Sequence, residues 1–183
     1  MTNDEPTYRK LRRLLERWND RGVRNLPGGT ILIAHSPEIA PEAYLHSLYP
    51  PLDEERIDLI EQEIQKPLPT SLRRFYGRHN GVFLFQDTSI YGLRTSYQRS
   101  NFDAMLEQPF DIVALNTYSR PGWGNPETIF LGSRNDVTEY VGCNPYGEIE
   151  VYSKATGQCL REGYAGVLEY LVQEIERRQN RIH

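Results

Sequence analysis

The segment LPTSLRRFYGRHNG, residues 68–81, constrains the fold of this chain more than any other stretch of its sequence. Pro67 and Pro69 end a preceding helix, because proline disfavours helical backbone at the residue before it. The apolar residues that follow recur with helical spacing, which predicts a second helix. The pair Asn80-Gly81 then reverses the chain, since both residue types tolerate positive φ angles. The segment therefore predicts two helices, separated by prolines, that lead directly into a strand.

One histidine of this segment raises the question of chemistry. Its apolar stripe consists of Leu72, Phe75, Tyr76 and His79. A histidine in the last turn of a helix can hydrogen-bond to the unpaired carbonyl groups there. A catalytic histidine needs a nucleophile, a carboxylate or a metal within hydrogen-bond reach, and the neighbouring sequence supplies none. We therefore expect a structural role for His79.

Helices and strands are segregated along the chain. Helical periodicity is found in residues 7–20, after the helix N-cap Asp53, and from residue 164 onwards. Short apolar or alternating runs predict strands, with NPYG and KATG as hairpin turns between the last three. The predicted strands are residues 82–85, 89–93, a strand centred on 112–115, 127–133, 137–144, 147–153 and 157–163; residues 30–35, before this run, form a further strand or a buried extended segment. This order indicates an α+β fold with N-terminal helices, a central, mainly antiparallel sheet of about five to seven strands and a C-terminal helix.

The pattern divides the chain into three parts. Residues 1–51 form an N-terminal helical extension and connector, residues 52–176 the α+β domain, and residues 177–183 a basic tail. Residues 36–51 contain four prolines, so any helix there is short. The leucine stripe of the first helix favours docking on the body of the protein, and its basic face leaves binding to an anionic surface as the alternative.

The charge distribution limits the class of partner. The formal net charge is −4, with seven basic and four acidic residues in residues 1–24 and four basic and nine acidic residues in residues 87–150. Binding of nucleic acid phosphates needs a concentrated positive face, so nucleic acid is not expected as a partner. An acidic stretch is compatible with a basic protein partner.

Membrane, metal and cofactor sites are not expected. No apolar run approaches the ~18 residues of a membrane span, and the N-terminus lacks the apolar core of a signal peptide, so we expect a cytoplasmic protein without membrane contact. Cys143 and Cys159 form no CxxC pair, and His35 and His46 have no cysteine or acidic residue at ligand spacing.

The stretch IDLIEQEIQKPLPTSLRRFYGRHNGV resembles the signature of the SUKH superfamily, the group around the yeast Smi/Knr cell-wall synthesis regulators. The matching positions are Glu61 in an acidic helix, Leu68-Pro69, Phe75-Tyr76 and Asn80-Gly81. The resemblance covers residues 52–176 and agrees with the late strands and the closing helix. Members often carry a Gly-rich strand pair ending in Asp, which is VGCNPYGEIEVYS here, so a partner-specific surface is expected to differ.

The resemblance implies binding rather than catalysis. Bacterial SUKH proteins are regarded as immunity proteins of polymorphic and contact-dependent toxin systems, which bind and neutralise toxin domains, often nucleases, in the cytoplasm. Eukaryotic relatives resemble signalling scaffolds. We therefore expect a non-enzymatic protein-binding module whose partner is a cognate toxin domain, with a regulatory adaptor of the Smi/Knr type as the alternative.

Carboxylates and aromatic side chains are the groups expected to bind such a partner. Carboxylates can mimic phosphate toward the basic site of a nuclease, and Tyr and Trp form compact hot spots. The candidates lie in the loop NTYSRPGWGNPE and in the strands and turns after it. They are Tyr118, Arg120, Trp123, Glu127, Asp136, Glu139, Tyr146, Glu148 and Glu150. The alternative is that Trp123 plugs the edge of the core and that the acidic residues are merely solvated.

Two residue pairs leave an enzyme as the less favoured hypothesis. The sequence contains no G-x-S-x-G, HExxH, P-loop or CxxC motif. Cys143 and His79 would form a dyad if the fold brought them together. Glu148 and Glu150 project to the same side of a strand and would serve acid–base chemistry if a pocket raised the pKa of one of them.

Overall fold

A computed structural model describes residues 4–97 and 101–179 of the chain. Its centre is an antiparallel sheet whose nine strands lie side by side in chain order. The strands are β1 (Val23–Asn25), β2 (Ile31–His35), β3 (Tyr44–Leu48), β4 (Val82–Leu84), β5 (Thr88–Ile90), β6 (Ile129–Arg134), β7 (Glu139–Cys143), β8 (Ile149–Ser153) and β9 (Cys159–Tyr164).

The α+β class and the antiparallel sheet are confirmed, but the expected count of five to seven strands is wrong. Strand β3 was missed because its neighbourhood is rich in proline. The prolines of that segment stand before Tyr44 and after Leu48, so they bound the strand without interrupting its ladder. Strand β1 is only three residues long, too short for any periodicity to be recognised.

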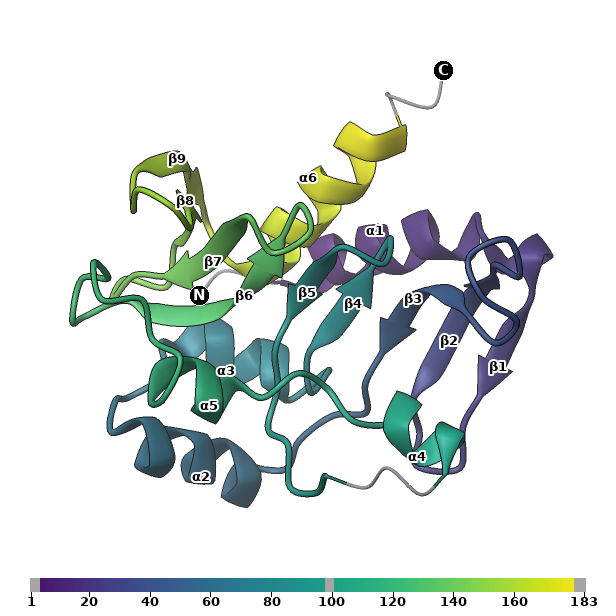
Figure 1. The fold of residues 1–183 in the computed structure, drawn as a ribbon, viewed down its shortest axis with the longest axis horizontal. Coiled ribbons are helices and arrows are strands. Elements are labelled where there is room, and N and C mark those ends of the chain that lie inside the picture. Colours follow the sequence, from purple (N-terminus) through teal and green to yellow (C-terminus); the bar gives the residue numbers. More distant parts are fainter. Residues whose placement is uncertain (1–3, 98–100, 180–183) are drawn as a thin grey trace.

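Six α-helices and one 3₁₀ helix flank the sheet within the described residues. They are α1 (Glu5–Glu16), η1 (Asn19–Arg21), α2 (Glu54–Ile64), α3 (Thr70–Tyr76), α4 (Phe102–Leu106), α5 (Ile112–Asn116) and α6 (Val167–Gln179). Figure 1 shows α1 beside α6, and α2 beside α5. The expected cap of α2 is confirmed, since the Asp53 carboxylate accepts a hydrogen bond from the Arg56 backbone N–H at 2.9 Å.

The strand expected at residues 112–115 is wrong, because this segment forms helix α5. The Asp111 side chain accepts hydrogen bonds from the backbone N–H groups of Val113, at 2.9 Å, and Ala114, at 3.3 Å. This cap satisfies the free donors of a first helical turn. A run of four apolar residues has no period that separates a buried strand from a short buried helix.

Helix α1 docks on the body of the protein, as its leucine stripe predicts. Leu11, Leu14 and Leu15 are each at most 4% exposed and join one core with apolar residues of α2, α3, α6 and the sheet. Such burial is worth roughly 1.5–3 kcal/mol per leucine. An ion pair of 2.7 Å between Lys10 and Glu176 of α6 lies beside this contact. Helix α1 is therefore packed against the body of the protein and is not a free amphipathic helix.

The N-terminal segment also shares the central sheet. Strand β3 pairs with β4, so the strands β1, β2 and β3 of residues 4–51 belong to the same sheet as the strands that follow. The expected division of the chain at residue 52 stays a prediction. Of the expected basic tail, residues 177–179 end α6, and residues 180–183 lie outside the described part.

The segment 68–81 links the helices to the sheet through its last three residues. His79 is 5% exposed, and its ring nitrogens lie 3.0 Å from the Tyr49 carbonyl and 3.1 Å from the Tyr8 hydroxyl. The expectation that it caps the carbonyls of its own helix is wrong, because α3 ends three residues earlier at Tyr76. Its structural role is instead to join α1 to the residue that follows β3.

Asn80 and Gly81 fix the entry into β4. The Asn80 side-chain amide forms a two-way bond with the backbone of Leu93, accepting at 2.6 Å and donating at 2.8 Å. Gly81 has a φ of 89°, and a Cβ there would collide with the carbonyl of Ile90. Only Gly81 of this pair adopts positive φ. The turn thus depends on an asparagine side chain and a glycine backbone together.

No helix in residues 4–97 and 101–179 has the length and apolar character needed to cross a membrane.

Candidate functional site

Trp123 is part of an aromatic cluster on the sheet rather than a freely projecting side chain. Its ring centroid lies 5.7 Å from those of Phe130 and Tyr152 and 6.2 Å from that of Tyr140. Its indole N–H donates to the Lys154 carbonyl at 3.1 Å. The side chain therefore covers the sheet surface, as in the alternative in which Trp123 plugs the edge of the core.

Arg120 fixes its own loop. Its Nη2 atom donates to the carbonyls of Asn125, at 2.6 Å, and Thr128, at 2.9 Å, and its guanidinium carbon lies 5.1 Å from the centroid of Phe130. Burial lowers the pKa of the Arg120 guanidinium. Because these donors are used within the loop, Arg120 is engaged in holding the chain before β6.

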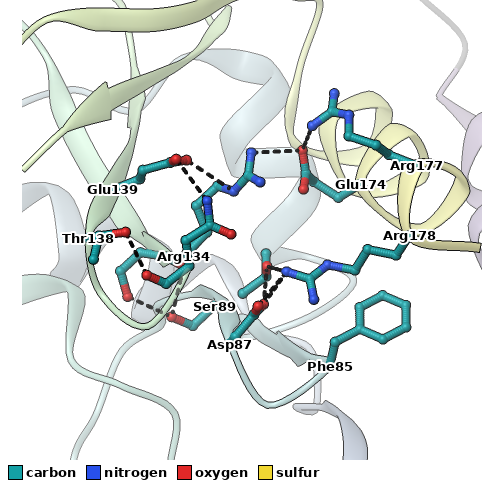
Figure 2. Close-up of polar contacts among 12 residues, drawn as sticks. Phe85, Asp87, Ser89, Arg134, Thr138, Glu139, Glu174, Arg177 and Arg178 are labelled. Atoms are coloured by element: carbon teal, nitrogen blue, oxygen red, sulfur yellow. Dashed lines mark hydrogen bonds and ion pairs between the residues drawn. The ribbon is translucent and has the colours of Figure 1, made fainter. Parts of the chain in front are cut away.

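Glu139 belongs to a group of charges around a buried arginine–glutamate pair, shown in Figure 2. Its carboxylate lies 3.2 Å from Nε of Arg134 and accepts from the Asn135 side chain at 2.8 Å. Arg134 in turn lies 3.3 Å from Glu174, and the side chains of Arg134 and Glu174 are 4% and 1% exposed. The arginines within 4 Å of Glu174 are Arg134, Arg161 and Arg177.

We call Arg134, Glu139, Glu174, Arg161 and Arg177 the arginine cluster. Its members come from β6, β7, β9 and α6, and Arg134 and Glu174 are 40 residues apart in the sequence. Pairing over such a distance leaves no local signal in the sequence. The cluster joins α6 to the sheet, so the role of Glu139 in this structure is a contact within the fold.

The turn over residues 144–148, between β7 and β8, is held rigidly by one side chain. The Asn144 side-chain oxygen accepts from the backbone N–H groups of Tyr146, at 3.0 Å, and Glu148, at 3.1 Å. The Gly147 N–H donates to the Asn144 carbonyl at 3.0 Å, which confirms the turn expected at NPYG. Ser71, at the start of α3, donates to the Gly147 carbonyl at 3.3 Å.

This turn presents one aromatic side chain to solvent. Tyr146 is 89% exposed, although the backbone that carries it is fixed on both sides. An exposed tyrosine on a rigid backbone loses little conformational entropy when a partner covers it. Tyr146 therefore has the properties of a binding residue.

Two carboxylates adjoin the turn. The Asn144 Nδ2 atom donates to Glu148 at 2.9 Å and to Glu150 at 3.4 Å, so one neutral amide holds both groups close together. Glu150 also accepts from the Tyr152 hydroxyl. Burial first, and then this hydrogen bond, raise the pKa of the Tyr152 hydroxyl. Neither carboxylate forms an ion pair with a cation of the described residues.

A groove of about 690 Å³ is lined by this turn and by the Leu-Pro segment before α3. Tyr146 and Glu148 line it from the turn, and Glu127 and Lys66 line it as well. The structure thus brings four of the predicted residues to one region: Glu127, Tyr146, Glu148 and, beside it through Asn144, Glu150. Sequence reasoning missed Asn144 and Ser71, which fix the turn against the helix.

Two further candidates lie away from this groove. Tyr118 is 92% exposed just after α5. Asp136 is exposed in the turn between β6 and β7 and has a φ of 52°. Neither lines the groove beside Tyr146, and a role for either in partner binding stays a prediction.

The residues that left enzymatic chemistry open have other contacts. Cys143 is fully buried, and burial raises the pKa of its thiol to about 12. Its Sγ–H donates to the Asn144 carbonyl at 3.5 Å. Both ring nitrogens of His79 contact Tyr8 and Tyr49, so the dyad with Cys143 is not formed. Across the described part of the chain, no group of three or more His, Cys, Asp or Glu residues is arranged to hold a metal ion.

The comparison with protein families gives one match. The model of the SMI1 / KNR4 family (SUKH-1) matches residues 51–168, more than half of the chain. These residues run from just before α2 to the start of α6 and include both walls of the groove beside Tyr146. No curated protein matches the chain.

Proposed function

Because the chain belongs to the SMI1 / KNR4 family (SUKH-1), we propose that it is a non-enzymatic protein-binding module and acts as an immunity protein. In this proposal it binds a cognate toxin domain directly, in the cytoplasm, and so neutralises it. Nucleases are the class of toxin that an acidic binding surface suits best, since their active sites bind phosphates with basic residues.

The observation that carries the proposal is the rigid turn over residues 144–148. It exposes Tyr146 on a backbone fixed by Asn144 and by Ser71, so little ordering is needed on binding. Tyrosine is enriched among residues that dominate interface energies. A preformed site with an exposed aromatic residue fits stable protein recognition better than it fits turnover of a small substrate.

The adjoining carboxylates support an acidic interface. Glu148 and Glu150 share the amide of Asn144 and have no arginine or lysine partner in residues 4–97 and 101–179. Their charges are therefore available to basic residues of a partner. Complementary charges raise the rate of association and select the partner.

The absence of catalysis is part of the proposal and has two supports. The Cys143 thiol, with a pKa near 12, is almost entirely protonated at neutral pH and is a poor nucleophile. The ring of His79 is occupied on both sides by contacts that join α1 to the sheet.

Co-expression with the product of the adjacent gene tests the proposal. We expect the two proteins to co-purify and the partner's toxic activity to be lost in the complex. Tyr146→Ala should weaken binding by about tenfold or more, as for an aromatic hot spot. Tyr118→Ala is the comparison variant: Tyr118 is equally exposed but lies off the groove, so a smaller loss there than with Tyr146→Ala assigns the contact to the groove.

The outcomes separate the two roles of the family. Loss of toxic activity in the complex supports the immunity function. A stable complex whose partner keeps its activity favours the regulatory adaptor. Failure of the two proteins to associate, or a greater loss with Tyr118→Ala than with Tyr146→Ala, would reject the proposal in its present form.

A further inference from the structure

Two grooves meet at the start of helices α3 and α6. The groove beside Tyr146 runs between the Leu-Pro segment and the 144–148 turn, and a second groove of about 690 Å³ runs between α1 and α6. Ser71 and Ala165 line both of them. The two therefore adjoin at Ser71 and Ala165, and we call them together the channel; Lys66 and Glu127 line the first groove, and Lys10 and Glu176 the second.

The basic side chains along this channel are all engaged within the protein. Lys66 donates to the carbonyls of Pro126 and Thr128, and burial is the main cause that lowers the pKa of its ammonium group. The other three form ion pairs with carboxylates. These are Arg74 with Asp4 at 3.0 Å, Lys10 with Glu176 at 2.7 Å, and Arg177 with Glu174.

Three carboxylates along the channel have no such partner in the described part of the chain. Glu148 accepts only from the amide of Asn144, and Glu169 accepts from the Ala165 N–H, at 2.7 Å, and from the Gln173 amide, at 3.1 Å. The charge of Glu127 partly opposes the lowering of the Lys66 pKa by burial, but Glu127 forms no ion pair with Lys66. Lys66, whose carbonyl partners are neutral, also keeps its charge, so among the described residues of the channel three negative charges and one positive charge have no ionic partner, and the net charge left for a partner is negative.

The lining of the channel indicates what kind of segment fits it. It mixes prolines and aliphatic residues with charged groups, whereas an amphipathic helix requires an uninterrupted apolar strip. An extended chain can place alternate side chains against such a lining while its backbone stays hydrated.

We propose that the channel through Ser71 and Ala165 binds an extended segment of the partner protein that carries lysine or arginine residues opposite Glu127, Glu148 and Glu169. This inference rests on the proposed function, because it names the part of a protein partner that the binding module recognises. The exposed Tyr146 at the channel wall then packs against the same segment.

Two synthetic peptides of twelve residues test this directly. They share the same apolar residues, and one carries four arginines where the other carries four glutamates. Backbone amide signals of the ¹⁵N-labelled full chain are followed during titration. We expect the basic peptide to shift the signals of Ser71, Gly147 and Ala165 in a saturable way, with a Kd about tenfold or more below that of the acidic peptide.

Two triple variants with the same change of net charge sharpen the test. Replacing Glu127, Glu148 and Glu169 by glutamine should raise the Kd of the basic peptide about tenfold. The control replaces Glu16, Glu55 and Glu63, three exposed carboxylates that line neither groove, and should change the Kd less than about twofold. Thermal unfolding of both variants establishes that they fold.

Equal weakening by the two variants would show attraction by net charge alone and would overturn the proposal. Peptide-induced shifts confined to other elements, tighter binding of the acidic peptide, or no binding of either peptide would overturn it as well. The measurement does not use the adjacent gene product, so a failure to find a toxin partner leaves its result unchanged. Conversely, a neutralised toxin together with an unresponsive channel would reject this inference alone.

Discussion

The two ends of strand β7 carry carboxylates with opposite roles. At one end, Glu139 is held in the arginine cluster, between Arg134 and a side chain of Asn135. At the other end, the turn over residues 144–148 leads into Glu148 and Glu150, which within the described residues accept from neutral groups only, the amide of Asn144 and, for Glu150, also the Tyr152 hydroxyl. The same residue type on adjacent strands thus fixes the fold in one place and remains available in the other. What differs is the supply of arginine from α6 and β6.

The difference teaches that an acidic stretch of sequence is not an acidic surface. Arginines from distant elements form ion pairs with the carboxylates near α6, and within the described residues no arginine pairs with Glu148 or Glu150. The comparison predicts large losses of stability at the arginine cluster and small ones at the turn, with the reverse order for partner binding.

The largest effect is expected for Glu174→Ala. This removes a carboxylate that is 1% exposed and has three arginine partners, and it leaves the buried Arg134, 4% exposed, with Glu139 as its remaining carboxylate. Breaking a buried pair in this way costs about 3–5 kcal/mol in the free energy of unfolding. Urea denaturation measures it, with Glu176→Ala on the same helix as the control. Glu176 is paired with Lys10 at the surface, and its loss should cost less than about 1 kcal/mol. Equal costs for the two variants would contradict the distinction.

The second-largest effect on stability is expected for charge reversal at Glu139, compared with charge reversal at Glu148 in the turn that follows β7. Glu139→Lys places a second cation beside Arg134 and should lower the free energy of unfolding by about 2 kcal/mol or more. Glu148→Lys should change it by less than about 0.5 kcal/mol, because Glu148 is exposed and paired only with an amide. Similar shifts in the urea midpoint for both variants would break the comparison.

A pH dependence is expected at the end of the sheet where the β4–β5 turn meets α6. His46, whose ring centroid lies 4.6 Å from that of Phe85, is buried, and this burial lowers the pKa of its imidazole from 6.5 to about 3. The unfolded chain therefore binds a proton between about pH 6.5 and pH 3 that the folded chain does not bind. Stability is full above pH 6.5 and falls as the pH drops through this window, by about 2 kcal/mol at pH 5.

Urea titrations at pH 7 and pH 5 measure this loss. His46→Phe should remove the part of the difference that His46 contributes, because the neutral aromatic ring takes no proton. Burial also lowers the pKa of the His79 imidazole, whose contribution the variant keeps. A difference of unchanged size in the variant would assign the pH dependence to other groups.

Local signals in the sequence were sufficient for part of the fold. Asp53 stands before a helix and caps it, and the NPYG turn forms where four turn-prone residues separate two strands. The structural role of His79 also followed from its place on an apolar stripe. Each of these features depends on residues within a few positions of one another, which is the range over which sequence patterns are informative.

The rest depended on contacts between distant residues. The partners of His79 are Tyr8 and Tyr49, which are 71 and 30 residues away in the sequence. The sequence predicts Glu139 at the surface, because no local pattern reveals its arginine partner. Arg134 lies across a hairpin and is itself paired with Glu174 of α6. The sequence predicts a strand at residues 112–115 because an apolar run this short has no clear period. The segment is a helix because the Asp111 side chain caps its first turn.

Hydrogen exchange of the complex with the adjacent gene product tests the central claim most directly. We predict that partner binding slows exchange of the backbone amides in residues 144–148 and at Ser71, while the amides of residues 134–139, beside the arginine cluster, exchange as in the free protein. Slowed exchange at residues 134–139 with none at residues 144–148 would contradict the account, because it would place the partner on the end of β7 that we assign to the fold.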